Sequence, residues 1–227
     1  MSALEPVAIL DYLRSRPRLT RWLERLRGRR YRLAPFADRE APLVVIAYRW
    51  RGAAAAGQMA VALQQDWPAV PQFCREAYEN ILERAPGLLV LDLRRQNRCR
   101  CLGHRHPLVR EEPFAEPHEA FGGAAVGEMD IAWERVQAWP ALPLQDTALD
   151  ARFLEGSRLD EFRSRQFRLR LLSVFLHETN HLVFPKESEA SVRARSLAFY
   201  RDALSSYVEG ACATLSFTLD RSFFRID

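Results

Sequence analysis

The stretch LLSVFLHETNHLVFPKE, residues 171–187, places two histidines and a glutamate inside an otherwise apolar run. Hydrophobic residues recur at helical spacing on both sides of HETNH, which predicts a buried helix from about 158 to 183 that Pro185 ends. Two imidazoles and a carboxylate are costly to bury in such a helix unless they have partners. A bound metal ion would supply that partner.

His177 and His181 are four residues apart, so a helix places both imidazoles on one face, one turn apart. Glu178 follows His177 directly and could reach a water molecule close to an ion held there. This is the HExxH spacing, in which the histidines bind zinc and the glutamate is the general base of a metallopeptidase. We therefore predict Zn²⁺ as the cofactor, His177 and His181 as metal ligands, and Glu178 as the catalytic residue. Core histidines satisfied by hydrogen bonds are the alternative.

A third protein ligand has to come from another part of the chain. Glu187 and Glu189 open the next predicted helix, residues 187–219, where the helix dipole favours acidic residues for reasons unrelated to a metal. Glu209 lies instead in SSYVEGACATLSF, among small and apolar residues that allow two helices to approach closely. We expect Glu209 to be the third metal ligand, with Glu189 as the alternative.

The rest of the chain mixes strands and helices. Runs of β-branched and aromatic residues predict strands, and amphipathic spacing predicts helices upstream of the two long ones. The predicted strands are 42–50, 88–93 and 128–138, and the predicted helices are 53–64 and 71–84. This order predicts an α+β fold of zincin-like type, in which a small mixed or antiparallel sheet lies beside the HExxH helix and the following ligand helix.

Length and composition are those of one globular domain. The chain has 227 residues, 48% of them hydrophobic, and no run of about 18 apolar residues that would span a membrane. Its N-terminus lacks the order of basic and then apolar residues that a signal peptide needs. We expect a cytoplasmic protein of a single domain, 1–227, with an Arg-rich helical N-terminal segment at 1–40 and a metallopeptidase core at 41–227.

Residues 14–32 hold nine arginines against one glutamate. One interpretation is a solvated helix face followed by a basic loop. The other is a phosphate-binding patch, with Trp22 and Tyr31 available to stack on bases. The candidate nucleic-acid-binding residues are Arg14, Arg16, Arg18, Arg21, Arg25, Arg27, Arg29 and Arg30.

An HExxH helix followed by a helix that carries a glutamate resembles the ImmA/IrrE family of small bacterial metallopeptidases, most closely the CapP metallopeptidases encoded beside CBASS anti-phage operons. The resemblance is carried by residues 171–219. It implies a gluzincin-like endopeptidase that cleaves a partner helix-turn-helix repressor in a stress or anti-phage defence pathway. It also implies activation by single-stranded DNA, for which the arginines of residues 14–32 would be the receptor.

A protease of this kind has to stay inactive until it is signalled, and a thiolate on the zinc would block the position that the catalytic water needs. Cys99 and Cys101 follow the predicted strand 88–93. We predict a cysteine switch in which Cys101, rather than Cys99, is an inhibitory fourth ligand that activation displaces. The alternative is that both cysteines are small residues of a buried strand. His104, next along the chain, is a candidate for stabilising the oxyanion.

Two other functions fit the same residues. One is a nucleic-acid-binding protein with a structural zinc site, and the other is a zincin scaffold that has lost catalysis. Glu178 distinguishes these from a peptidase, because neither needs a general base beside the two histidines.

Overall fold

A five-stranded mixed sheet organises the chain. The computed structural model describes residues 28–36, 42–97, 101–105, 126–138 and 157–214, together with Leu19, Trp22 and Leu26. The strands are β1 (Arg30–Pro35), β2 (Leu43–Tyr48), β3 (Leu88–Arg94), β4 (Gly103–Arg105) and β5 (Val126–Ala132). They lie in the order β1-β2-β3-β5-β4. The three central strands are parallel, and β1 and β4 pair antiparallel at the two edges.

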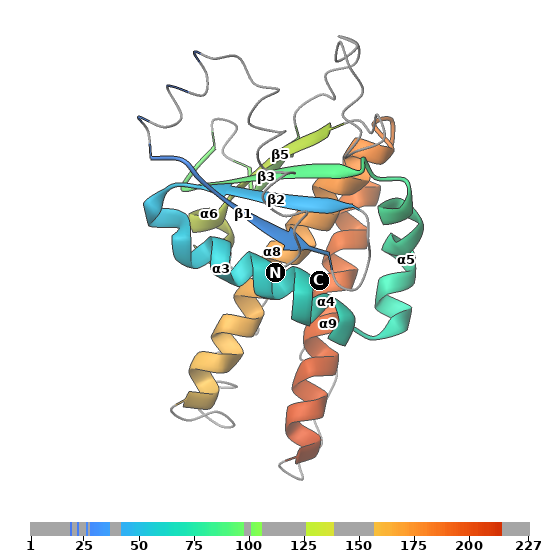
Figure 1. Ribbon diagram of the computed structural model, residues 1–227. Helices are drawn as coiled ribbons and strands as arrows, with labels where there is room; N and C mark the ends of the chain where they lie inside the picture. Colours follow the sequence, from blue (N-terminus) through green and yellow to red (C-terminus); the bar gives the residue numbers. More distant parts are fainter. Residues whose placement is uncertain are drawn as a thin grey trace.

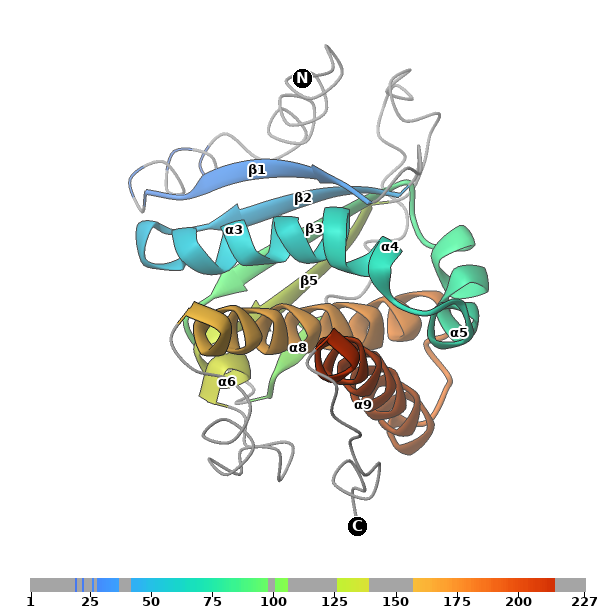
Figure 2. The same cartoon turned by 90° about the horizontal axis from the view of Figure 1, so that it is seen from below.

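Helices cover one face of this sheet (Figures 1 and 2). After β2 a short turn, η1 (Trp50–Gly52), leads into α3 (Ala53–Val61), a π-helical turn η2 (Ala62–Asp66) and α4 (Trp67–Ala69). The other helices are α5 (Gln72–Glu83), α6 (Trp133–Ala138), α8 (Ser157–Val183) and α9 (Glu189–Thr214). None of the helices within the described residues is long and apolar enough to cross a membrane.

The strands bury both of their faces. Val44 and Ile46 of β2 join the main core under the helices, whereas Val45 belongs to a second cluster on the opposite face, with Leu88 and Val90 of β3. Each of these three is at most 2% exposed. Alternate residues of a strand point to opposite faces, and strands buried on both faces read as continuous β-branched and aliphatic runs.

The apolar run of α8 is the centre of the main core. Leu171, Leu172, Phe175 and Leu176 are completely buried, and burial of each such side chain contributes about 1.5–3 kcal/mol. The helix ends at Val183 because Pro185 cannot continue it. The chain turns there and enters α9, whose first turn is capped by the Ser188 hydroxyl, which accepts a hydrogen bond of 3.2 Å from the Ser191 N–H.

Most predicted elements are confirmed. The strands at 42–50 and 88–93, the helices at 53–64 and 71–84 and the two long C-terminal helices are all present. The mixed α and β composition is confirmed as well, with a sheet that is parallel at its centre.

Three expectations differ from the structure. The predicted strand 128–138 ends at Ala132 and Trp133 opens α6, because the alternation of apolar residues continues for one residue into the helix. The short strand β4, which begins two residues after Cys101, is absent from the predicted strands. Residues 30–35, which we assigned to a helical N-terminal segment, form β1 and pair with β2. The core sheet therefore begins before residue 41.

Candidate metal site

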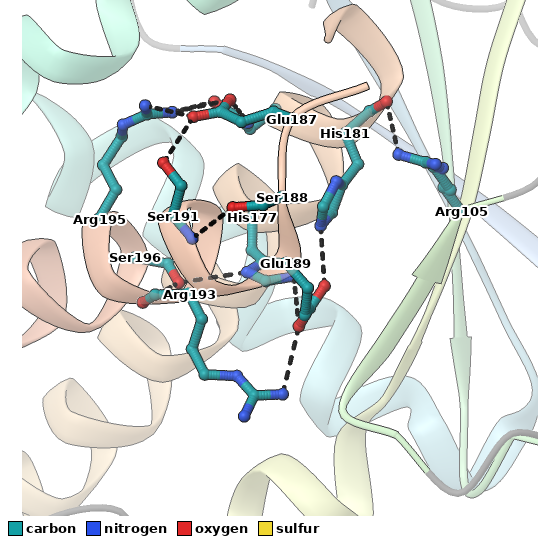
Figure 3. Close-up of polar contacts among 11 residues, drawn as sticks. Arg105, His177, His181, Glu187, Ser188, Glu189, Ser191, Arg193, Arg195 and Ser196 are labelled. Carbon is teal, nitrogen blue, oxygen red and sulfur yellow. Dashed lines mark hydrogen bonds and ion pairs between the residues drawn. The ribbon is translucent and has the colours of Figure 1, made fainter. Parts of the chain in front are cut away.

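The HETNH sequence lies in the last two turns of α8, just before the chain turns into α9 (Figures 1 and 3). His177 and His181 point to the same side of the helix, with ring centroids 4.8 Å apart. Glu189, the first residue of α9, faces both rings. The turn between the helices therefore brings three potential ligands to one point.

Distances within this cluster are those of a small cation site. Nε2 of His181 is 3.0 Å from Oε2 of Glu189, and Nε2 of His177 is 3.6 Å from Oε1 of the same carboxylate. One ligand atom of each of the three residues lies within 4.8 Å of the other two. Two histidine nitrogens and a carboxylate oxygen are a typical zinc donor set that leaves a fourth position open.

Hydrogen bonds around His177 orient its ring. Nδ1 of His177 is 3.2 Å from the Ser196 hydroxyl, and that hydroxyl donates its own proton to the Arg193 carbonyl at 3.0 Å. An Nδ1–H of His177 that donates to Ser196 would leave the lone pair of Nε2 free for a metal ion. Nε2 of both histidines and the Glu189 carboxylate face one point, so the donor atoms fit a metal ion.

Glu178 is buried on the sheet side of α8, beneath β4. The backbone of β4 passes so close that a Cβ on Gly103 would lie 2.6 Å from Oε1 of Glu178. Burial, together with the nearby charge of Glu189, raises the pKa of Glu178 to about 8, against the lowering effect of the Arg105 charge and backbone N–H. Burial therefore favours the protonated form of this carboxyl in the metal-free protein, and a cation bound nearby would favour the carboxylate that a general base needs.

Arg105 supports the same end of α8 from β4. Its guanidinium donates a hydrogen bond of 2.7 Å to the backbone carbonyl of His181 (Figure 3). That carbonyl is one of the last four of the helix, which have no partner within the helix itself. The β4 strand therefore fixes the position of the metal-site residues relative to Glu178.

A second network fixes the turn that carries Glu189. We call it the Asn180 clamp: the buried amide of Asn180 donates a hydrogen bond of 2.5 Å to Glu187, and Arg195 binds both residues, with 2.6 Å to Glu187. Ser191 donates a further bond of 3.0 Å to Glu187. These hydrogen bonds, that from Arg195 first, lower the pKa of Glu187 to about 2, so the carboxylate stays charged. The clamp ties α8, the turn and α9 together beside the metal cluster.

The expected role of Glu209 does not fit the helix that carries it. Its side chain lies outside the described residues, but its backbone belongs to α9, twenty residues and about 30 Å along the axis from Glu189. Tyr207 stacks on Phe162 with ring centroids 6.3 Å apart, and Phe162 precedes His177 by four turns of α8. Position 209 is therefore at the far end of the helix pair, and the structure favours Glu189 as the third ligand.

The predicted inhibitory thiol lies outside the cluster. Sγ of Cys101 accepts a hydrogen bond of 3.3 Å from the Asn97 side-chain amide. It is not among the ligands grouped with His177 and His181 in the described part of the chain. Cys99 is outside the described residues, so the cysteine switch stays a prediction. His104 does not face the site, because it alternates with Gly103 and Arg105, which both point toward α8.

Of the predicted nucleic-acid-binding residues, Arg29 and Arg30 lie within the described chain, and Arg14, Arg16, Arg18, Arg21, Arg25 and Arg27 lie outside it. Arg29 pairs with Asp92 at 3.4 Å and is mostly buried, which is a structural role. Arg30 is exposed.

A further exposed aromatic, Trp50, was not predicted from the sequence as part of a nucleic-acid-binding surface. Trp50 is 69% exposed, and the Arg51 guanidinium lies 5.2 Å from its ring centre. Arg49, the residue before Trp50, is also exposed. The sequence RWR, residues 49–51, follows a buried strand immediately and could have indicated an exposed aromatic between basic residues.

Comparison with family models, with curated proteins and with solved structures finds no match to this chain.

Proposed function

We propose that this chain is a zinc-dependent peptidase of zincin-like fold. One observation carries the proposal: His177, His181 and Glu189 present three ligand atoms within 4.8 Å of one another, and the buried Glu178 adjoins them on the same helix. A structural zinc site would have no use for that fourth residue. A fold that had lost catalysis would have no need of a general base beside the two histidines.

The chemistry follows from the roles of the residues. Zinc held at such a site supplies Lewis acidity, which polarises a carbonyl group and lowers the pKa of water. Glu178 accepts the proton of the attacking water and then delivers it to the leaving amine. Burial beneath β4 keeps this carboxyl away from bulk water, and Arg105 provides the nearest positive charge.

A polypeptide is the substrate class that the site supports best. Strand β4 is one of the two edge strands of the sheet in the described part of the chain, and its Gly103 lies directly over Glu178. An extended peptide can be aligned along such a strand by backbone hydrogen bonds. From the resemblance described above, we propose that the natural substrate is a helix-turn-helix repressor in a cytoplasmic stress or anti-phage defence pathway.

The test compares Glu178→Gln with the parent. Zinc content and fold should be retained, and cleavage of a co-expressed helix-turn-helix protein encoded beside this chain should be lost. Glu76→Gln is the matched control, because Glu76 is an exposed glutamate of α5 far from the site in sequence. Cleavage by Glu178→Gln at the parent's rate would contradict the mechanism.

Activation by single-stranded DNA is a further part of the proposal. Exposed Trp50 supports it, because an aromatic ring beside the Arg51 guanidinium, with exposed Arg49 next to it in sequence, suits a stacked base and its phosphates. Register pairing of Arg30 with Tyr48 brings β1 beside this turn. Binding of an oligonucleotide should weaken steeply with salt and fall in Trp50→Ala. Binding unaffected by either change would exclude this surface.

A further inference from the structure

Ser196 is the only residue in the described chain that contacts the second ring nitrogen of a proposed metal-binding histidine. Ser196 lies in α9 and is 5% exposed, and its hydroxyl contacts His177 of α8. The corresponding nitrogen of His181, Nδ1, is buried and has no hydrogen-bond partner among the described residues. The two histidines therefore differ in how their rings are held.

The Ser196 hydroxyl can donate its single proton to one partner. It donates to the Arg193 carbonyl at 3.0 Å, and its oxygen can then accept the Nδ1–H of His177 across 3.2 Å. This arrangement places the His177 proton on Nδ1 and the lone pair on Nε2. The reverse arrangement, in which the Ser196 O–H donates to Nδ1, would place the proton on Nε2, and the tautomer measured below distinguishes the two.

The backbone of Ser196 is held as firmly as its side chain. The Ser173 hydroxyl of α8 donates a hydrogen bond of 2.8 Å to the Ser196 carbonyl. Ser173 lies one turn before His177 on the same helix, so the hydroxyl that orients His177 is tied to the helix that carries His177. The result is a fixed distance between the Ser196 oxygen and the imidazole.

We propose that Ser196 is a positioning residue that holds His177 in the tautomer and orientation presenting Nε2 to the metal. The proposal rests on the metal site described above. Residues that accept a hydrogen bond from the outer nitrogen of a metal-binding histidine typically contribute 10–100-fold to metal affinity. Ser196 is not one of the three proposed ligands, and its hydroxyl contacts His177, so we expect it to act on the metal through His177.

The test uses Ser196→Ala, with Ser206→Ala as the matched control. Ser206 also lies in α9 and donates to a backbone carbonyl, that of Asp202 at 2.9 Å, but it is not bonded to a histidine in the described structure. Two measurements are made on each protein: the tautomer of His177 in the metal-free protein, from long-range ¹H–¹⁵N NMR, and the zinc dissociation constant, from chelator competition.

We expect the parent and Ser206→Ala to carry the His177 proton on Nδ1. In Ser196→Ala the proton should move to Nε2, and zinc should bind about 10–100-fold more weakly. An unchanged tautomer, or a zinc affinity within twofold of the parent, overturns the proposal. If Ser196→Ala does not fold, the parent decides, because a proton found on Nε2 of its His177 also overturns it.

The same experiment separates this inference from the proposed function. A parent protein that binds no zinc contradicts the metal site and, with it, the role of Ser196 toward a metal. A parent that binds zinc tightly while Ser196→Ala binds equally well contradicts only the inference.

Discussion

Gly103 of β4 and Glu178 of α8 are in direct contact: a Cβ at position 103 would lie 2.6 Å from Oε1 and 2.8 Å from Cγ of the glutamate. The side chain of Val174 would be equally close, at 2.7 Å. The backbone of β4 therefore packs directly against the side chain of Glu178 in α8. Only a residue without a side chain allows this approach, and the position of Glu178 depends on it.

The first prediction is that Gly103→Ala strongly reduces peptidase activity and leaves zinc binding intact. The added methyl group must displace either β4 or Glu178, and a displacement of about 1 Å in a catalytic group can cost about 100-fold in rate. The added Cβ would meet Glu178 and Val174 rather than His177, His181 or Glu189, so the proposed metal ligands should not move. Activity and zinc dissociation constant are measured together.

Gly57→Ala is the control for this substitution. Gly57 lies in α3, and the nearest atom to an added Cβ there is 3.7 Å away, an ordinary contact. This variant should retain full activity. Full activity in Gly103→Ala as well would show that the position of Glu178 is not critical.

The second prediction concerns the third ligand. Glu189→Gln removes the only charged ligand from the proposed cluster of His177, His181 and Glu189. Zinc should then bind more than about 100-fold more weakly, because loss of a direct ligand costs more than loss of a residue that only hydrogen-bonds to a ligand. Glu209→Gln should bind zinc as the parent does, because position 209 is about 30 Å along α9 from the cluster. The reverse result would restore Glu209 as the ligand.

The choice between Glu209 and Glu189 shows what the sequence could and could not predict. The HExxH helix and its buried environment follow from local spacing and composition, and both are confirmed. The third ligand depends on how two helices meet, and small residues around Glu209 suggested a close contact without locating it. In a pair of antiparallel helices only residues near the turn can reach the last turn of the first helix. Glu189, eight residues after His181, satisfies that condition.

The β1 strand was missed for a different reason. Its sequence RYRLAP was counted with the arginine-rich segment, so charge density obscured a two-residue alternation. Tyr31 and Leu33 pack on the second core cluster, and Arg30 and Arg32, which alternate with them, are exposed. Long arginine side chains on an edge strand are compatible with a strand because they extend into water.

The third prediction concerns the Asn180 clamp. Arg195→Ala leaves Glu187 and Asn180 without their shared cation, which should lower the free energy of unfolding by about 1 kcal/mol, since the guanidinium is partly exposed. Zinc affinity should also fall, because the clamp fixes the turn that carries Glu189. Denaturant unfolding and zinc competition measure both effects. Arg201→Ala, which removes only an exposed pair with Asp202, should change neither.

The fourth prediction is a pH dependence of stability from the same clamp. The pKa of Glu187 falls from its ordinary value of 4.5 to about 2 on folding. The charged carboxylate therefore stabilises the folded protein above about pH 4.5, and this contribution is lost as the pH falls toward about 2. In the metal-free protein, the difference in unfolding free energy between the parent and Glu187→Gln should be largest near neutral pH. A difference that grows on acidification would contradict this linkage.

The last prediction tests whether Cys101 ever binds the metal. Its thiol is partly exposed and bonded to Asn97, whereas Cys74 is buried, and burial together with the charge of Asp202 raises the pKa of Cys74 to about 11. At pH 8 iodoacetamide should therefore modify Cys101 much faster than Cys74, since the thiolate is the reactive form. Peptide mapping follows each site separately. In the arrangement seen here, zinc should leave the rate at Cys101 unchanged. Protection of Cys101 by zinc, with Cys74 unaffected, would instead show that the thiol can leave Asn97 and join the metal as a cysteine switch requires.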